Sequence, residues 1–192
     1  DRATRFECPG SRETVHSHRI RPSPRSRQEN LEGGGTLTVS MLLAFVPVLL
    51  FLTELRLLDS YKLVGRPALV RSIAWGAVAA LACLAIHEGL LVSGLVDRQT
   101  AGRYVGPITE ETLKALFVAS LLVRRRIGFP VDALIHGFAV GTGFAVVENA
   151  VYLGSLGGGS TVFWMVRGVG TAVLHGATTA IFAMISRTRV DS

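Results

Sequence analysis

The chain has 192 residues, of which 49% are hydrophobic and 18% charged, and its mean hydropathy is +0.43. Typical soluble domains are about 25% charged, so this composition argues against a soluble domain and predicts a single integral membrane domain. The net charge of +6 does not indicate nucleic-acid binding, because 7 of the 20 Lys and Arg residues lie in the first 27 positions and most others flank apolar segments. We therefore expect a lipid bilayer as partner, and no nucleic acid.

Residues 1–36 are expected to form a disordered polar tail. They are rich in Arg, Ser, Pro and Glu, lack hydrophobic periodicity and contain the run Gly33 to Gly35. The tail is not a secretory signal, because its apolar region comes too late, and the chain begins with Asp1 rather than Met. These features are expected of a fragment or of an over-extended reading frame.

Five apolar runs follow the tail, and each is long enough to cross about 30 Å of hydrocarbon as a helix, the third only barely. They are residues 37–58, 70–96, 107–123, 131–154 and 161–185. Backbone polar groups in lipid must find their partners within the segment, so helices are the only option for these runs. The fold class is therefore predicted to be all-α, a polytopic membrane bundle of about five transmembrane helices over residues 37–186.

The distribution of Lys and Arg between these runs predicts the orientation of the chain in the membrane. One set of connections and ends is basic: Arg56, Lys62, Arg66, Arg71, Arg124, Arg125, Arg126, Arg187 and Arg189. The opposite connections hold only Arg98 and Arg103. The basic side is expected to be cytoplasmic.

The third run carries charges close to its start. Pro107 opens the helix, and Glu110, Glu111 and Lys114 follow within two turns. On a soluble helix these would compensate the dipole and form a Glu110 to Lys114 pair. In a membrane the two adjacent carboxylates point about 100° apart, so one lysine cannot satisfy both. One glutamate is therefore expected to be available as a base.

The fourth run combines small and ionisable residues. Gly137, Gly141 and Gly143 are expected mainly to allow close helix contact. Asp132 and His136, near the start of the run, are interpreted as a capping carboxylate and an interfacial histidine.

Further into the membrane, the fourth and fifth runs carry polar groups that need partners on other helices. Glu148 has Asn149 beside it and Tyr152 one turn on. In the fifth run, Arg167 is expected to neutralise Glu148 or Glu110. His175, with Thr179 one turn further, is either a hydrogen bonder between helices or a ligand or acid/base group.

The second run adds the adjacent pair His87 and Glu88. Neighbouring residues diverge around a helix, so only one of them can face a common cavity. Ionisable residues on four runs together predict a membrane-embedded functional site.

Three motifs on consecutive runs resemble those of the PrsW-type intramembrane proteases, distant relatives of the type II CAAX prenyl proteases. The motifs are Glu110-Glu111-x-x-Lys114, Phe144-x-x-x-Glu148-Asn149, and Arg167 followed by His175-x-x-x-Thr179. The resemblance covers about residues 104–185, and its specificity comes from the order of the motifs on successive helices.

The resemblance implies a multi-pass endopeptidase of the cell membrane that cleaves membrane-anchored proteins such as anti-sigma factors. It implies catalytic roles for Glu110, Glu111, Glu148 and His175, supported by Lys114, Asn149, Arg167 and Thr179.

Two mechanisms remain open at this stage. In one, Glu111, Glu148 and His175 hold a zinc ion that activates water. In the other, a glutamate deprotonates water without metal, and Arg167 or Asn149 stabilises the oxyanion. The two cysteines, Cys8 and Cys83, are too few for a thiolate cluster.

One geometric difficulty accompanies this assignment. Counted inward from the outer helix ends at about 1.5 Å per residue, Glu111 lies about 6 Å deep and Glu148 about 9 Å, whereas His175 lies about 20 Å deep. Either the helices tilt and shift relative to one another, or the fifth helix starts beyond the glycine turn at residues 157–159.

Two other classes of function compete with the protease. A non-catalytic membrane scaffold or binding protein of the same fold would bind partners without turnover. A proton-coupled transporter could also use buried Glu, Arg and His, but the five runs show no credible inverted repeat.

Overall fold

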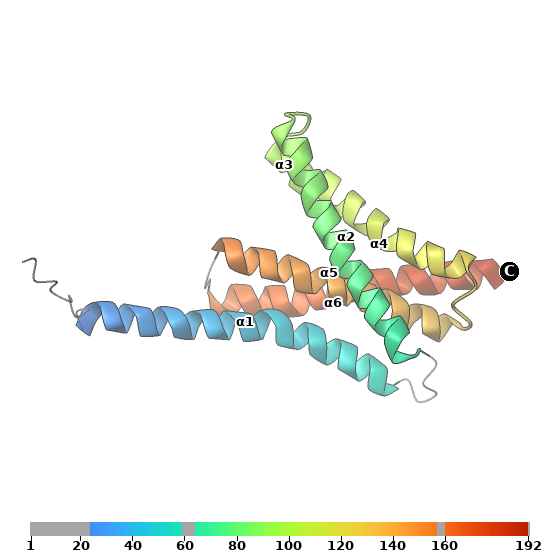
Figure 1. Ribbon diagram of the computed structural model, residues 1–192, viewed down its shortest axis with the longest axis horizontal. Helices are drawn as coiled ribbons and strands as arrows, with labels where there is room; N and C mark the ends of the chain where they lie inside the picture. Colours follow the sequence, from blue (N-terminus) through green and yellow to red (C-terminus); the bar gives the residue numbers. More distant parts are fainter. Residues whose placement is uncertain (1–23, 59–63, 157–159, 192) are drawn as a thin grey trace, which may run out of the picture.

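The computed structural model describes residues 24–58, 64–156 and 160–191, and most of these residues are helical (Figure 1). The helices are α1 (Pro24–Leu58), α2 (Arg66–Val92), α3 (Arg98–Thr100), the π-helix η1 (Ala101–Val105), α4 (Gly106–Val123), α5 (Pro130–Leu156) and α6 (Thr161–Asp191). The described residues contain no strand. The predicted all-α membrane bundle is confirmed.

Within the described residues, four segments are long and apolar enough to cross a membrane: Thr36–Glu54, Arg66–Val92, Pro130–Leu156 and Thr161–Arg189. The helix α4 corresponds to the third predicted run. It has 18 residues, of which Glu110, Glu111 and Lys114 are charged, and it is not among these four segments. It continues the helical path of α3 and η1 from residue 98 onward.

Two helix boundaries differ from the predicted runs. The first helix begins at Pro24 rather than near residue 37, so the later part of the predicted tail is helical. Proline suits a first helical position, and extending a helix that has already formed costs far less than nucleating one. Residues 1–23 of the predicted tail lie outside the described residues. The second helix, α2, starts and ends about four residues earlier than its run, because Pro67 lies in its first turn and Gly94, at φ 69°, follows its end.

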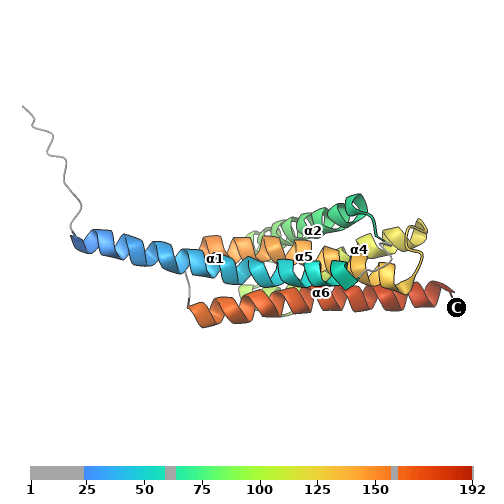
Figure 2. The same cartoon turned by 90° about the horizontal axis from the view of Figure 1, so that it is seen from below.

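The helix α5 is the centre of the bundle. It is buried over 67% of its most apolar stretch, compared with 17% to 35% for the other three membrane-spanning segments. It packs along α6 and α2, and α1 covers α5 and α6 from another side (Figures 1 and 2). The helices α2 and α4 form a hairpin that diverges from α5 and α6 toward α3 (Figure 1).

Glycines in α5 allow its neighbours to approach closely, as expected. A Cβ at Gly141 would overlap the backbone of α6 at His175, and a Cβ at Gly143 would overlap the backbone of α2 at Ile73. Residues two apart on a helix point to nearly opposite sides. The pair Gly141 and Gly143 therefore brings two helices against α5 at the same depth, one on each side.

The helix ends that are rich in Lys and Arg lie together at one end of the bundle. There, Leu69 of α2 packs with Ile135 of α5, and Val118 of α4 packs with Ala133 of α5 and Ala183 of α6. The start of α2, the end of α4, the start of α5 and the end of α6 therefore share one end. This is the arrangement that an alternating membrane topology requires, and the cytoplasmic assignment of this end stays a prediction.

Candidate active site

A buried lysine is the centre of the predicted site. The side chain of Lys114 is 0% exposed, and its Nζ lies 2.6 Å from Glu111 Oε1 and 3.0 Å from His175 Nδ1. The same ammonium lies 4.6 Å from the centre of the Phe144 ring. Lys114 pairs with Glu111 at i,i+3 rather than with Glu110 at i,i+4. One lysine on α4 thus connects the first motif to the histidine of the third.

The contacts of His175 define its tautomer. A protonated lysine can only donate, so His175 Nδ1 accepts from Lys114 and the ring proton belongs to Nε2. Nε2 then donates to Glu148 Oε2 at 2.8 Å. The ring also contacts Phe144, with a centroid separation of 5.0 Å. Both ring nitrogens of His175 are therefore engaged in this arrangement.

Arg167 completes the charge balance at Glu148. Its Nη2 lies 3.0 Å from Glu148 Oε1, which makes Glu148 the partner that the sequence left open between Glu148 and Glu110. The guanidinium also lies 3.4 Å from the centre of the Tyr152 ring. Two cations, Lys114 and Arg167, are thus matched by two carboxylates, Glu111 and Glu148. Such pairing is required for charges to persist in a membrane interior.

The predicted difference in depth between Glu148 and His175 is present in the backbone. Gly141 lies opposite His175 and Gly137 lies opposite Thr179, so Glu148 is level with about residue 168, roughly 10 Å from His175 along the axis. The helix α6 begins at Thr161, the residue from which the depth of His175 was counted, so a start further along the chain is not the explanation. Side chains on a helix lean toward its N-terminus, and because α5 and α6 are antiparallel, Glu148 and His175 lean toward each other. Side-chain direction thus closes the gap.

Glu110 lies in a small cavity beside this network. The cavity has a volume of about 110 Å³ and is lined by Ala80, Cys83, Leu84, His87, Glu110, Phe144, Glu148, Val151 and Tyr152. Water needs only about 10–15 Å³ of such volume, so several molecules fit. Within the described residues, the half-buried Glu110 makes no hydrogen bond or ion pair. The predicted unpaired glutamate is therefore Glu110.

Glu111 faces a different space. Its side chain is 49% exposed, and it lines a cavity of about 250 Å³ with Thr112, Ala115, Thr179 and Phe182. Thr179 is buried and donates through Oγ1 to the carbonyl of His175 on its own helix. The two adjacent glutamates of the first motif therefore have separate surroundings, as their angular separation predicted.

Asn149 lies on the side of α5 away from the cavity. It is fully buried and donates from Nδ2 to the Ala44 carbonyl on α1, while its Oδ1 accepts from Thr171 on α6. Its amide joins three helices. Both polar atoms of its side chain are thus engaged in contacts between helices.

Asp132 and His136 are not part of the network around Lys114 and do not line the cavity at Glu110. Asp132 Oδ2 accepts from the backbone N–H groups of Gly128 and Phe129, just before α5 begins. His136 Nδ1 lies 2.8 Å from Ser72 Oγ on α2. Both therefore serve the start of α5.

Several residues of the site were not identified from the sequence or were identified only weakly. Phe144 was part of a motif without a role, and its ring contacts both Lys114 and His175. Cys83 lines the cavity from α2 and had no assigned role. His87 lines the cavity, whereas Glu88 is exposed, so the predicted choice between the two falls on His87. An apolar residue one turn before a buried charge was the available signal for Phe144.

The predicted zinc ligands do not fit a common metal in this arrangement. Lys114 lies at Nδ1 of His175 and connects this nitrogen to Glu111, whereas Glu148 lies at Nε2, on the other side of the ring. One metal binds one ring nitrogen, so Glu111 and Glu148 cannot both join His175 as ligands. The part of the chain that the structure describes contains no group of three or more His, Cys, Asp or Glu side chains suited to a metal ion.

Comparison with known proteins gives one match. A family model described as PrsW family intramembrane metalloprotease matches residues 65–189, well over half of the chain. The matched region runs from the turn before α2 almost to the end of α6 and includes all three motifs. No curated protein sequence and no solved structure gives a significant match.

Proposed function

The chain belongs to the PrsW family of intramembrane metalloproteases, and from this premise we propose that it hydrolyses peptide bonds of membrane-anchored proteins such as anti-sigma factors. Family membership and the four membrane-spanning segments make the chain a multi-pass integral membrane protein. The proposal concerns the reaction, the residues that perform it and the class of substrate.

One observation carries the proposal. An unpaired carboxylate, Glu110, shares a cavity large enough for water with Glu148, whose two oxygens are held by Arg167 and His175. A carboxylate without a counter-ion in an apolar surrounding favours taking up a proton. Glu110 is therefore suited to act as a general base, and Glu148 as a fixed acceptor that orients the water.

The reaction follows from these positions. Glu110 takes one proton from water, and the hydroxide adds to the carbonyl carbon of the scissile peptide. The resulting oxyanion is stabilised by the guanidinium of Arg167, whose Nη2 pairs with Glu148 and whose Nε makes no hydrogen bond within the described residues. The tetrahedral species then breaks its C–N bond, and Glu110 returns the proton to the leaving amine. The products are a carboxylic acid and an amine; the acid gives its proton to the amine or to water, and the base is regenerated.

The remaining network residues act on this chemistry indirectly. His175 holds Glu148 Oε2, and Lys114 fixes the tautomer of His175. Glu111 in turn neutralises Lys114. In this proposal Glu111 is a positioning residue, a narrower role than the catalytic one that the family resemblance implies.

The test is cleavage of a single-pass membrane substrate by purified protein in lipid vesicles. We expect the parent to release a fragment and Glu110→Gln to be slower by at least about 100-fold, the usual contribution of a general base. Glu88→Gln is the matched control, because Glu88 is an exposed glutamate on α2 that does not line the cavity. Equal cleavage by all three proteins would exclude this mechanism, and substrate binding without turnover by the parent would favour the non-catalytic scaffold.

A further inference from the structure

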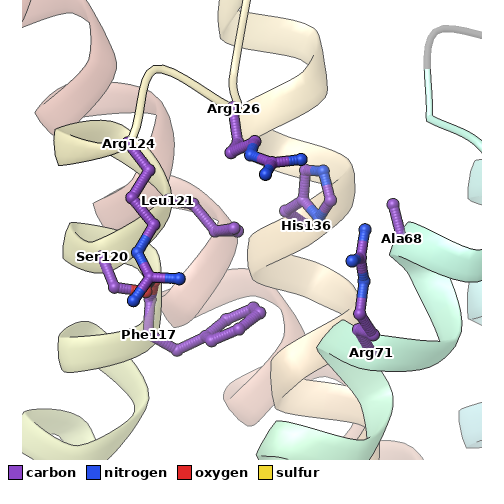
Figure 3. A pocket seen from close by; sticks show the side chains of 8 residues that line it. All are labelled: Ala68, Arg71, Phe117, Ser120, Leu121, Arg124, Arg126 and His136. Atoms are coloured by element: carbon purple, nitrogen blue, oxygen red, sulfur yellow. Dashed lines mark hydrogen bonds between the residues drawn. The ribbon is translucent and has the colours of Figure 1, made fainter.

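A second cavity lies near the basic end of the bundle, away from the candidate active site. It has a volume of about 280 Å³ and is lined by Ala68, Arg71, Phe117, Ser120, Leu121, Arg124, Arg126 and His136 (Figure 3). Arg71 precedes His87, which lines the active-site cavity, by 16 residues of α2, or about 24 Å along the helix. The two cavities are therefore separate sites.

The charge of this cavity is not balanced by the protein. Arg71, Arg124 and Arg126 come from α2 and from the end of α4 with its following turn (Figure 3), and no acidic residue lines the cavity. Across the described residues these three arginines make no hydrogen bond or ion pair. The nearby carboxylate of Asp132 accepts from two backbone N–H groups through Oδ2. Three unpaired guanidinium groups around one hollow form a site for an anion.

The chemistry of the guanidinium group narrows the choice of anion. Its planar fork of N–H donors matches the oxygens of phosphate in a bidentate manner. The Ser120 hydroxyl donates to the carbonyl of Phe117, so the donors to the anion are the three arginines. The volume of about 280 Å³ is close to the lower end of ligand pockets in general, about 300 Å³. A phosphate with a small substituent fits this size.

The apolar side of the cavity favours a lipid over a soluble phosphate. Ala68, Phe117 and Leu121 contribute an apolar wall. Phe117 stacks on Trp75 with a centroid separation of 5.4 Å, and Trp75, one turn further along α2 than Arg71, is 38% exposed. Basic groups at helix ends with exposed aromatic side chains one turn deeper are the arrangement of a membrane interface. Basic pockets between transmembrane helices at that level suit lipid headgroups.

We propose that this cavity binds the phosphate of an anionic phospholipid headgroup, with Arg71, Arg124 and Arg126 as its ligands and the acyl chains directed toward the Trp75 and Phe117 pair. The site is independent of the proposed peptidase reaction. Occupation by lipid would join α2 to the turn between α4 and α5 through a single anion.

The experiment measures lipid binding by the full chain in a neutral detergent. Native mass spectrometry would count bound phosphatidylglycerol against phosphatidylcholine over a titration series. We expect tighter binding of phosphatidylglycerol, weakened about fivefold by each Arg→Gln substitution and about 100-fold by all three together. Arg98→Gln with Arg103→Gln, at the opposite end of the bundle, is the control and should change little.

Three results would overturn the proposal: equal binding of both lipids, unchanged binding by the triple variant, or an equal loss in the control. A further arm adds inorganic phosphate or glycerol phosphate as competitor. Displacement of the lipid at equal concentrations would assign the site to a soluble phosphate and overturn the lipid assignment. If the triple variant does not fold, Arg124→Gln, which alters one exposed side chain, gives the decisive comparison.

Discussion

At the scale of single residues, Lys114 decides how the charges of the site are arranged. It is fully buried, and its ammonium contacts Glu111, His175 and the face of Phe144. Because a lysine donates and never accepts, it orients the imidazole and leaves Nε2–H for Glu148. The chain of contacts from α4 through α6 to α5 therefore depends on one ammonium group.

Replacing this ammonium tests its role. We expect Lys114→Met to reduce the free energy of unfolding by about 1–3 kcal/mol, because His175 Nδ1 loses its donor inside the bundle. Glu111 is half exposed and regains water, so it adds little to the loss. Cleavage should fall as well, because His175 is no longer held toward Glu148. Thermal unfolding in detergent measures the first effect, with Arg103→Gln as the control cation; equal stability of Lys114→Met and the parent would contradict this view.

The structure argues against Glu111 as a metal ligand together with Glu148 and His175. Because Lys114 lies between Glu111 and one nitrogen of His175 and Glu148 lies at the other nitrogen, we expect Glu111→Gln to leave the metal content of the purified protein unchanged. Elemental analysis of the variant and the parent, purified in parallel, provides the measurement. Loss of bound zinc in Glu111→Gln alone would show that Glu111 is a ligand and that the network rearranges around the metal.

At the scale of helices, the packing of α5 on α6 brings the second and third motifs together. The close approach requires glycine at position 141, where a Cβ would overlap the α6 backbone beside His175. The distance between Glu148 and His175 therefore depends on a residue that carries no functional group.

Gly141→Ala should separate α5 from α6. We expect a destabilisation of about 1–3 kcal/mol, the usual cost of overpacking, together with slower cleavage. Gly154→Ala is a matched control on the same helix, because a Cβ there meets nothing within 4 Å. That substitution should be neutral or stabilising by up to about 1 kcal/mol. The same loss of thermal stability in both variants would argue against a specific contact at Gly141.

The helices were largely predictable from the sequence, whereas the side-chain contacts along and between them were not. Apolar length predicted the helices because lipid leaves the backbone no other choice. Pairing on a single helix was less certain: i,i+3 and i,i+4 partners compete, and the pair observed is Glu111 with Lys114. The site lies between helices and depends on the direction of each side chain, which cannot be predicted from hydropathy. Counting residues therefore predicted the backbone offset of His175 but missed its contact with Glu148.

At the scale of the whole molecule, the site forms only where the α2 and α4 hairpin meets the α5 and α6 pair. Cys83 and His87 come from α2, Glu110, Glu111 and Lys114 from α4, and the remaining site residues from α5 and α6. Sequence could indicate which residues are ionisable and buried, because lipid penalises them. It could not indicate that Asn149 faces α1, since that depends on how α1 packs over α5.

The orientation of the bundle is a prediction at this scale. The basic end should face the cytoplasm, so a cysteine at Thr188 near the end of α6 should react with an impermeant maleimide only when the cytoplasmic side is accessible. A cysteine at Ser155, near the end of α5, should show the opposite pattern; both positions are exposed. Labelling in intact cells and inverted vesicles, in a background without Cys8 and Cys83, makes the comparison. The reverse pattern would invert the topology.

The most direct measurement of the central claim compares two adjacent glutamates. The rate of cleavage of a single-pass substrate in lipid vesicles should fall at least about 100-fold in Glu110→Gln, because the base is lost. In Glu111→Gln it should stay within about tenfold of the parent, because only the partner of Lys114 changes. Full activity of Glu110→Gln, or a larger loss in Glu111→Gln than in Glu110→Gln, would contradict the account.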